Sequence, residues 1–134
     1  MYNTIIVAMG YEDRLAAQAL NVARKLRSEG GKIIAVHVIE PIPNIVRSYL
    51  PKDHDEETES SILEQIGREI ESTRDAEATV LRGHPGATIT EYAREVRADC
   101  IVVGSHEVAF SDYLLGSTAA RIVRHAPCSV HVLR

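Results

Sequence analysis

Short apolar runs alternate with amphipathic segments along this chain, and the alternation predicts most of its secondary structure. Five runs are apolar and rich in β-branched residues, as strands buried on both faces are. The segments between them repeat apolar residues at helical spacing. The predicted strands span residues 4–9, 32–40, 77–83, 100–104 and 129–133, and the predicted helices lie within 14–28, 53–72, 84–99 and 119–126.

The connections between these elements carry signals of their own. Gly30 and Gly31 are expected to stop the first helix, because glycine commonly ends helices. Residues 40–53 are punctuated by prolines and are predicted to form a loop. The acidic run 53–59 is typical of a solvated helix start, where the helix dipole favours carboxylates, rather than of a metal site.

The order of the elements predicts the fold class. Strands that alternate with helices form a parallel sheet covered on both faces. A chain of 134 residues corresponds to one domain, spanning 1–134, and is long enough to bury a core. A doubly wound sheet of this kind binds ligands outside the carboxyl ends of its strands, where the strand order reverses. We therefore expect a single-domain α/β protein with a binding site at one edge of its sheet.

Charge and composition exclude several classes of function. The formal net charge is −4 and the pI about 5.8, whereas nucleic-acid-binding domains are basic. No stretch approaches the roughly 20 apolar residues that span a bilayer, and the first residues lack the features of a signal peptide. Cys100 and Cys128 lie in apolar strand contexts and are predicted to be buried thiols in a reducing compartment. We expect a cytoplasmic protein with no nucleic-acid or membrane partner.

The last third of the chain contains the strongest candidate site. Gly104 ends the apolar run 100–104 and lets the backbone turn at the carboxyl end of a strand. Twelve residues later, Gly116-Ser117-Thr118 precedes a segment of helical spacing. A helix start with free N–H groups and two hydroxyls is a natural anion site. A strand, a glycine loop and a helix start in this order are typical of a cradle for nucleotide phosphates.

This segment resembles the universal stress protein family, and the resemblance covers nearly the whole chain. The short F/G-type branch of that family reads roughly Gly-Ser-His-Arg-Pro, a few residues, then Tyr-Leu-Leu-Gly-Ser-Asn-Ala. The residues of this chain that match the branch are Ser105, His106, Tyr113, Leu114, Leu115, Gly116, Ser117, Ala119, the triplet Arg124-His125-Ala126 and the strand start Cys128-Ser129-Val130.

The resemblance implies both a fold and a ligand. It implies a five-stranded parallel sheet of order 3-2-1-4-5, of the adenine nucleotide alpha hydrolase-like type, with a crevice between strands one and four. It implies an adenine nucleotide there, with ATP the expected ligand and Mg²⁺ a companion of the phosphates. The nucleotide-binding residues it indicates are Ala8, Gly10, Val38, Val103, Gly104, Ser105, His106, Gly116, Ser117 and Thr118.

Two departures from the family pattern bear on that ligand. Glu107 stands where many nucleotide-binding members have a second glycine, and a like charge beside a phosphate weakens binding. Gly10 stands where members that hold ATP usually have an aspartate that contacts the nucleoside. Tyr11 or Glu12 would compensate for that loss, or the site has lost its ligand.

Enzyme motifs are missing from the sequence. It contains no G-x-S-x-G, H-E-x-x-H or GxxxxGK[ST] motif, and no Cys-x-x-Cys. We therefore expect a binding protein rather than a catalyst, one that acts in the stress response through its bound state and through protein partners that the sequence does not identify. Two alternatives stay open. The first is a nucleotide-free dimeric interaction module, and the second is a weak ATPase in which His106 or Glu107 positions a water.

The last predicted strand is the candidate for self-association. In the order 3-2-1-4-5 it lies at the edge of the sheet, where unpaired N–H and C=O groups invite pairing. Family members of this shape commonly dimerise by pairing these strands, which implies a homodimer through Val130, His131 and Val132. His131, like His37 in the second strand, is expected to be a packed or interface side chain rather than a ligand.

Overall fold

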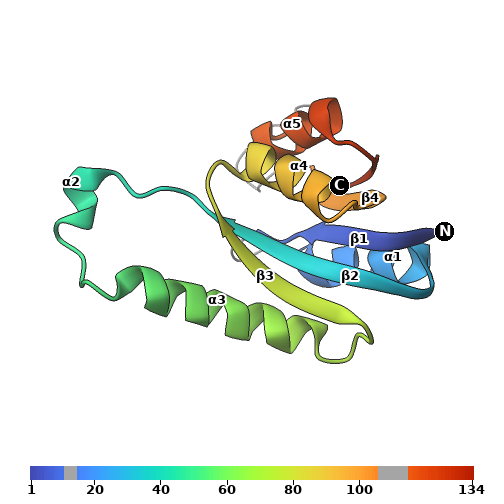
Figure 1. Ribbon diagram of the computed structural model, residues 1–134, viewed down its shortest axis with the longest axis horizontal. Helices are drawn as coiled ribbons and strands as arrows, with labels where there is room; N and C mark the ends of the chain where they lie inside the picture. The colour runs from blue at the N-terminus through green and yellow to red at the C-terminus, as the bar shows by residue number, and fades with distance from the viewer. Residues whose placement is uncertain (11–14, 106–114) are drawn as a thin grey trace.

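The predicted fold class and strand order are confirmed. The computed structural model describes residues 1–10, 15–105 and 115–134. Its five-stranded parallel sheet has the order β3-β2-β1-β4-β5 (Figure 1). The strands are β1 (Tyr2–Ala8), β2 (Arg27–Ile39), β3 (Ala76–Arg82), β4 (Cys100–Gly104) and β5 (Ser129–Leu133), and the helices are α1 (Ala16–Leu26), α2 (Asn44–Arg47), α3 (His54–Ile70), α4 (Pro85–Glu95) and α5 (Ser117–His125).

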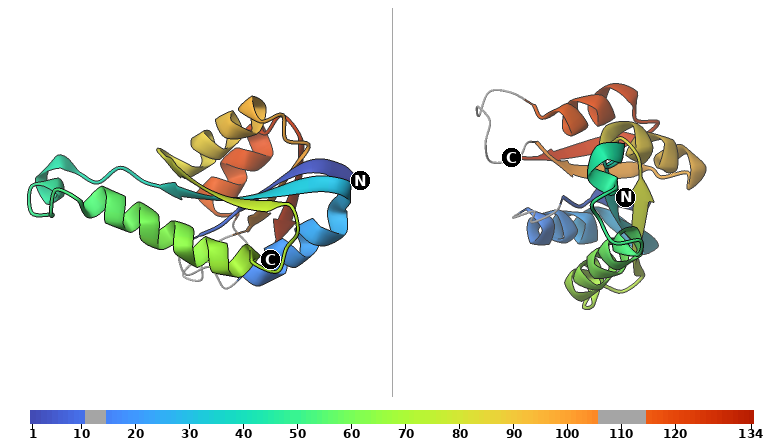
Figure 2. Two further views of the ribbon diagram at one scale, coloured as in Figure 1. Left: turned by 60° about the horizontal axis from the view of Figure 1, so that its bottom comes forward. Right: turned by 90° about the vertical axis from the view of Figure 1, so that its left-hand side faces the viewer.

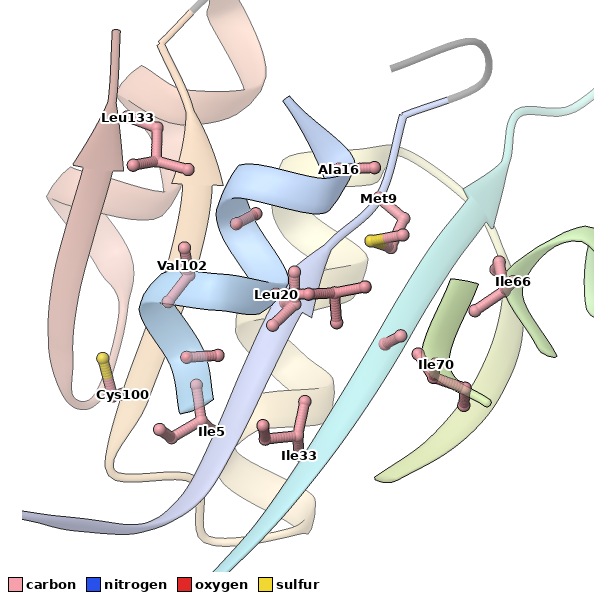
Figure 3. Close-up of a cluster of buried hydrophobic side chains, with 14 of the residues drawn as sticks. Ile5, Met9, Ala16, Leu20, Ile33, Ile66, Ile70, Cys100, Val102 and Leu133 are labelled. Atoms are coloured by element: carbon pink, nitrogen blue, oxygen red, sulfur yellow. The ribbon is translucent and has the colours of Figure 1, made fainter. Parts of the chain in front are cut away.

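Helices cover both faces of the sheet, which explains why its central strands are continuously apolar. In β1, the residues Ile5, Ile6 and Val7 are all fully buried although their side chains alternate between the two faces. The pair α1 and α3 covers one face and the pair α4 and α5 the other (Figure 2). Figure 3 shows the core on the α1 and α3 side, a single cluster that includes Leu20 of α1, Ile66 of α3, and Ile33 and Val102 of the sheet.

The predicted role of Gly30 and Gly31 as a helix stop is wrong. The helix α1 already ends at Leu26, and both glycines lie inside β2. The strand register shifts between the pair Tyr2–Arg27 and the pair Thr4–Lys32, so this part of β2 bulges. Gly30 has a φ of 77°, and a Cβ on Gly31 would lie 3.0 Å from the Tyr2 carbonyl oxygen. The glycines are therefore needed for a bulge and a close backbone approach, not for a helix end.

The segment predicted as a loop contains a short helix. Residues 44–47 form α2, and this part of the chain extends away from the sheet (Figure 1). The acidic run is the start of α3, as predicted, and two of its carboxylates pair with arginines. Asp55 Oδ2 lies 2.6 Å from Arg47 Nη1, and Glu59 Oε2 lies 3.0 Å from Arg82 Nη2. The guanidinium of Arg47 holds the pKa of Asp55 below its usual value.

A carboxylate anchors the first strand at the amino end of the sheet. Asp99 precedes β4, and its two oxygens accept hydrogen bonds from the backbone N–H groups of Asn3 at 2.8 Å and Thr4 at 2.9 Å. The Asp99 N–H in turn donates to the Thr4 carbonyl at 3.0 Å. These bonds fix the register of β1 against β4, on which the alignment of their carboxyl ends depends. Among the described residues, no helix is long and apolar enough to cross a membrane.

Two glycines give a matched prediction on stability. Gly67 lies inside α3, and a Cβ added there would meet no atom within 4 Å. Because glycine costs a helix interior about 0.5–1 kcal/mol relative to alanine, Gly67→Ala is expected to raise the free energy of unfolding by that amount. Gly31→Ala is expected to lower it by at least about 1 kcal/mol, since its Cβ would press on two backbone carbonyl oxygens. Urea titrations of the two variants measure both effects, and a destabilised Gly67→Ala would contradict the first.

Candidate functional site

The carboxyl ends of β1, β2 and β4 lie together at one end of the sheet, hereafter the site edge. Val7 pairs with Val102 on β4, which places Met9 level with Gly104. Ala8 pairs with Val36 on β2, which places Gly10 level with Val38. The strand register therefore brings together the predicted residues from β1, β2 and β4, at the point where the strand order reverses.

Ser105 ties the start of α5 to this edge. Its N–H donates to the Leu133 carbonyl at 2.6 Å, and its own carbonyl accepts from the Gly116 N–H at 2.6 Å. The residue is buried, with only 4% of its surface exposed. One residue thus links the end of β4, the end of β5 and the residue before α5. Consequently, the first turn of α5 stands beside Gly104.

The first turn of α5 offers hydrogen-bond donors at this edge. Ser117 begins the helix and is exposed, and the Ala120 N–H is the first to bond back to Gly116, at 2.8 Å. The N–H groups before it have no acceptor within the helix, as at every helix start. No side chain caps them from the N-cap position, because that residue is Gly116. The helix dipole adds positive potential there, so this turn favours an anion.

The side chains of three predicted nucleotide-binding residues are not available to a ligand. Ala8, Val38 and Val103 are all buried in the cluster between the sheet and the helices α4 and α5. Only their backbone atoms face the edge. The other predicted residues are more open, apart from Ser105: Gly10 and Ser117 are exposed, and Gly104, Gly116 and Thr118 are half-buried. His106, like Tyr11, Glu12 and Glu107, lies outside the described residues.

The backbone of Val38 presents polar groups at this edge. The Val36 carbonyl accepts from the Met9 N–H at 2.8 Å, so alternate residues of β2 direct their peptide groups toward β1. Val38 is the next residue in that series, but β1 has already ended at Ala8. The N–H and C=O groups of Val38 have no hydrogen-bond partner among the described residues. Buried peptide groups are normally paired, so this donor and this acceptor are available to hydrogen-bond a ligand.

His37 contacts the chain where β1 ends. Its Nδ1 lies 2.8 Å from the Met9 carbonyl oxygen, and because a carbonyl only accepts, Nδ1 carries the proton. The imidazole thus bonds the carbonyl of the residue that follows β1, at the level where the ladder between β1 and β2 ends. A hollow of about 10 Å³, room for at most one water, lies beside it between Gly10 and Glu69. The prediction of a packed histidine is confirmed, but its contact with Met9 has no signal in the sequence.

Gly104 has a packing reason to be glycine. A Cβ at this position would lie 3.2 Å from Cδ1 of Leu15, tighter than most such contacts. Leu15 precedes α1, so the glycine allows α1 to start close to the end of β4. Sequence reasoning found Gly104 from its place after a strand, but missed Leu15 and the linking role of Ser105.

Neither cysteine lies at this edge, and burial disfavours the thiolate form of both. Cys100 starts β4 at the opposite end of the sheet and is buried, while Cys128 precedes β5 and is half-buried. Burial, with smaller contributions from Cys128 and Asp99, raises the pKa of Cys100 from 9.0 to about 11. Burial also raises the pKa of Cys128. The prediction of buried thiols is confirmed for Cys100 and holds in part for Cys128.

The raised pKa of Cys100 predicts slow alkylation. At pH 8 a rise from 9.0 to about 11 lowers the thiolate fraction about a hundredfold, and the thiolate is the nucleophile. Iodoacetamide is therefore expected to label native Cys100 at least a hundredfold more slowly than the same thiol in urea, as read by peptide mass spectrometry. Because the unfolded thiol ionises first, stability is expected to fall as the pH rises from 9 toward 11. Equal labelling rates in the folded and unfolded protein would contradict this.

Comparison with known proteins gives one family. The sequence model described as "Universal stress protein family" matches residues 1–134. Universal stress protein G of Salmonella typhimurium is 30% identical over the full length of both chains. A universal stress protein of Thermus aquaticus, described by its place in the QAH/OAS sulfhydrylase 3′ region, is 28% identical over the full length of both.

Solved structures show the same fold. Universal stress protein UspA from Lactobacillus plantarum superposes with a TM-score of 0.78 at 23% identity, over 99% of this chain and 98% of the other. A universal stress protein from Archaeoglobus fulgidus in complex with dAMP superposes with a TM-score of 0.64 at 25% identity, over 99% of this chain and 98% of the other. A universal stress protein in complex with cAMP superposes with a TM-score of 0.69 at 24% identity, over 99% of this chain and 97% of the other.

Proposed function

This chain belongs to the universal stress protein family, and we propose that it binds an adenine nucleotide where the ends of β1 and β4 meet the start of α5. The single observation that carries the proposal is the hydrogen bond of 2.6 Å from the Gly116 N–H to the Ser105 carbonyl. This bond holds a helix N-terminus beside the end of a strand at the reversal of the strand order. Two relatives of the same fold are complexes with dAMP and cAMP, which supports an adenine nucleotide as the ligand.

The phosphates are assigned to the α5 side of the site. The free N–H groups of the first turn and the hydroxyls of Ser117 and Thr118 are donors, and the helix dipole favours negative charge. ATP presents more phosphate oxygens than AMP and is the proposed ligand, with Mg²⁺ as a companion of the phosphates. We expect ATP to bind more tightly than AMP, and both affinities to fall as salt screens the charge.

The base is assigned to the β2 side of the site. The N–H and C=O groups of Val38 are a donor and an acceptor without described partners, and adenine presents both kinds of group on its edge. Gly10 brings no side chain between Val38 and the end of β4. Because the wrong base would leave these buried peptide groups unpaired, we expect ATP to be preferred to GTP.

Calorimetric titration tests the proposal. ATP, ADP, AMP and GTP are titrated into protein freed of nucleotide, each with Mg²⁺ and with EDTA, and native mass spectrometry of the freshly purified protein shows what it carries. The expected result is binding of adenine nucleotides in the order ATP, ADP, AMP. Absence of binding at millimolar ATP would overturn the proposal and favour the nucleotide-free dimeric module, for which Gly10 in place of an aspartate and Glu107 in place of a glycine are the supporting features.

The proposed output is contact with other proteins. No nucleophile, base and orienting group are found together among the described residues of the site, and its donors suit holding phosphates. We propose that the protein acts in stress survival through its nucleotide-bound state, as a homodimer joined along β5. Val130, His131 and Val132 lie on this edge strand and are all half-buried. A phosphate-release assay on the same samples tests the alternative of weak ATP hydrolysis.

A further inference from the structure

The sheet is open along β3, the edge strand on the side away from β5. β3 is the last strand on that side and pairs only with β2. The Asp75 carbonyl accepts from the Ile33 N–H at 3.0 Å, and the Gly83 N–H donates to the Ile39 carbonyl at 3.0 Å. Odd-numbered residues of β3 thus direct their peptide groups inward, and the peptide groups of Ala78 and Val80 point outward. Neither residue has an outward hydrogen-bond partner among the described residues.

A short groove lies beside this edge, between Leu81 of β3 and the helix α4. In Figure 1, β3 lies with α3 below it and α4 above it, and α3 covers only one face of the strand. On the other face, a hollow of about 390 Å³ opens between Leu81 of β3 and the α4 residues Thr88, Glu91, Tyr92 and Glu95. Leu81 and Tyr92 are both half-buried and form its apolar part. The hollow is large enough to take a side chain from a neighbouring strand.

The charged residues of the groove are all acidic. They are Glu91 and Glu95, which lie one helical turn apart and are exposed. Glu91 Oε2 lies 3.6 Å from Arg94 Nη1, but the guanidinium of Arg94 also donates to the His125 carbonyl at 3.1 Å, toward α5. Glu95 has no ion-pair partner among the described residues. The negative potential of this groove is therefore only partly neutralised.

We infer that the β3 edge binds an extended peptide of another protein, which adds as a sixth strand and carries apolar and basic side chains two residues apart. The outward peptide groups of Ala78 and Val80 supply the main-chain ladder. Side chains two residues apart in a strand share a face, so one fills the space between Leu81 and Tyr92 while the next reaches Glu95. A second copy of this chain is a poor occupant, since a twofold axis at this edge would bring the two sets of glutamates together.

A designed peptide tests the inference directly. The probe is fluorescein-labelled Thr-Leu-Val-Lys-Val-Lys-Thr, and the control peptide carries glutamate in place of both lysines. Fluorescence anisotropy is expected to show saturable binding of the lysine peptide, with the glutamate peptide at least tenfold weaker. Hydrogen exchange is expected to show new protection of the Ala78 and Val80 amides. Equal binding of the two peptides, absence of binding at millimolar protein, or protection confined to β5 would each overturn the inference.

Variants separate the ladder from the charge. Val80→Pro removes an outward N–H that has no partner among the described residues, so the fold is expected to persist while peptide affinity falls at least tenfold. Val80→Ala is its matched control, since it makes a similar cut in packing and keeps the N–H. Glu95→Lys is expected to weaken binding of the lysine peptide at least tenfold. This substitution lies in α4, so it leaves the strands of the sheet unchanged. Circular dichroism serves as the fold check, and undiminished peptide affinity in Glu95→Lys or in a folded Val80→Pro would refute the inference.

Discussion

A Gly116→Val variant is expected to fold normally and to bind ATP at least a hundredfold more weakly than the wild-type protein. Gly116 occupies the N-cap of α5 with a φ of −57° and a ψ of 156°, which valine can adopt. Its N–H bond to the Ser105 carbonyl involves no side chain and is expected to persist. The isopropyl group is instead expected to obstruct the N–H groups of the first turn, which have no acceptor within the helix. Blocking two hydrogen bonds to a charged phosphate costs about 3 kcal/mol or more, and 1.4 kcal/mol is tenfold in affinity.

Graded variants at the same turn separate obstruction from lost chemistry. Ser117→Ala removes one hydroxyl but keeps the backbone N–H, so the loss of ATP affinity is expected to be about fivefold, equivalent to ~1 kcal/mol. Gly116→Ala is expected to lie between the two. Calorimetry measures all three, and circular dichroism checks the fold. If Gly116→Val is folded and retains the wild-type affinity, the phosphates do not lie at the start of α5 and the proposed site is misplaced.

The fold was predictable because its local and global signals agree. The run Ile5-Ile6-Val7 is apolar at consecutive positions, which only a strand covered on both faces tolerates, and it is the centre of the sheet. In α3, Ile62, Ile66 and Ile70 recur one turn apart and are the residues of that helix that are buried. The strand order came from the family resemblance, since periodicity alone does not say which strands are neighbours.

The sequence misled where a glycine serves tertiary structure. Gly30-Gly31 follows a helical pattern and is typical of a helix end, but the pair belongs to a bulge opposite Tyr2. The close approach to the Tyr2 carbonyl is a contact between distant segments, and nothing near the glycines in the sequence announces it. The helix α2 was missed for a related reason, because four residues among prolines are too few for a periodic signal.

The candidate site was predictable in its position but not in its chemistry. The glycines Gly104 and Gly116 marked the two segments that the Ser105 hydrogen bonds bring together. The contribution of β2 is different in kind, because it lies in the peptide groups of Val38 and not in its buried side chain. No described residue pairs with those groups, and the His37 imidazole bonds the Met9 carbonyl beside them. A contact made by backbone atoms leaves no preference for a residue type, so only the family resemblance, and no feature of the residue itself, indicated Val38.

A Val132→Pro variant is expected to convert the proposed homodimer into a folded monomer. The Ser105 N–H donates to the Leu133 carbonyl, so Leu133 directs its peptide groups toward β4 and Val132 directs its own outward. The outward N–H of Val132 has no partner among the described residues, and proline there costs the monomer no hydrogen bond. In an antiparallel pairing of two β5 strands about a twofold axis, the same N–H would be a ladder donor.

Light scattering at micromolar concentration measures the change in mass, and a substitution that shortens the Val132 side chain is the control. Val130 and Val132 pair with Ile101 and Val103 on the α4 and α5 side, whereas His131 pairs with Val102 and lies on the other face. Val132→Ala keeps the outward N–H and is expected to remain dimeric, with weaker association from the smaller apolar contact. The wild-type protein is expected to have twice the mass of Val132→Pro. A monomeric wild type, or a folded Val132→Pro that is still a dimer, would show that the two copies do not associate through the β5 ladder.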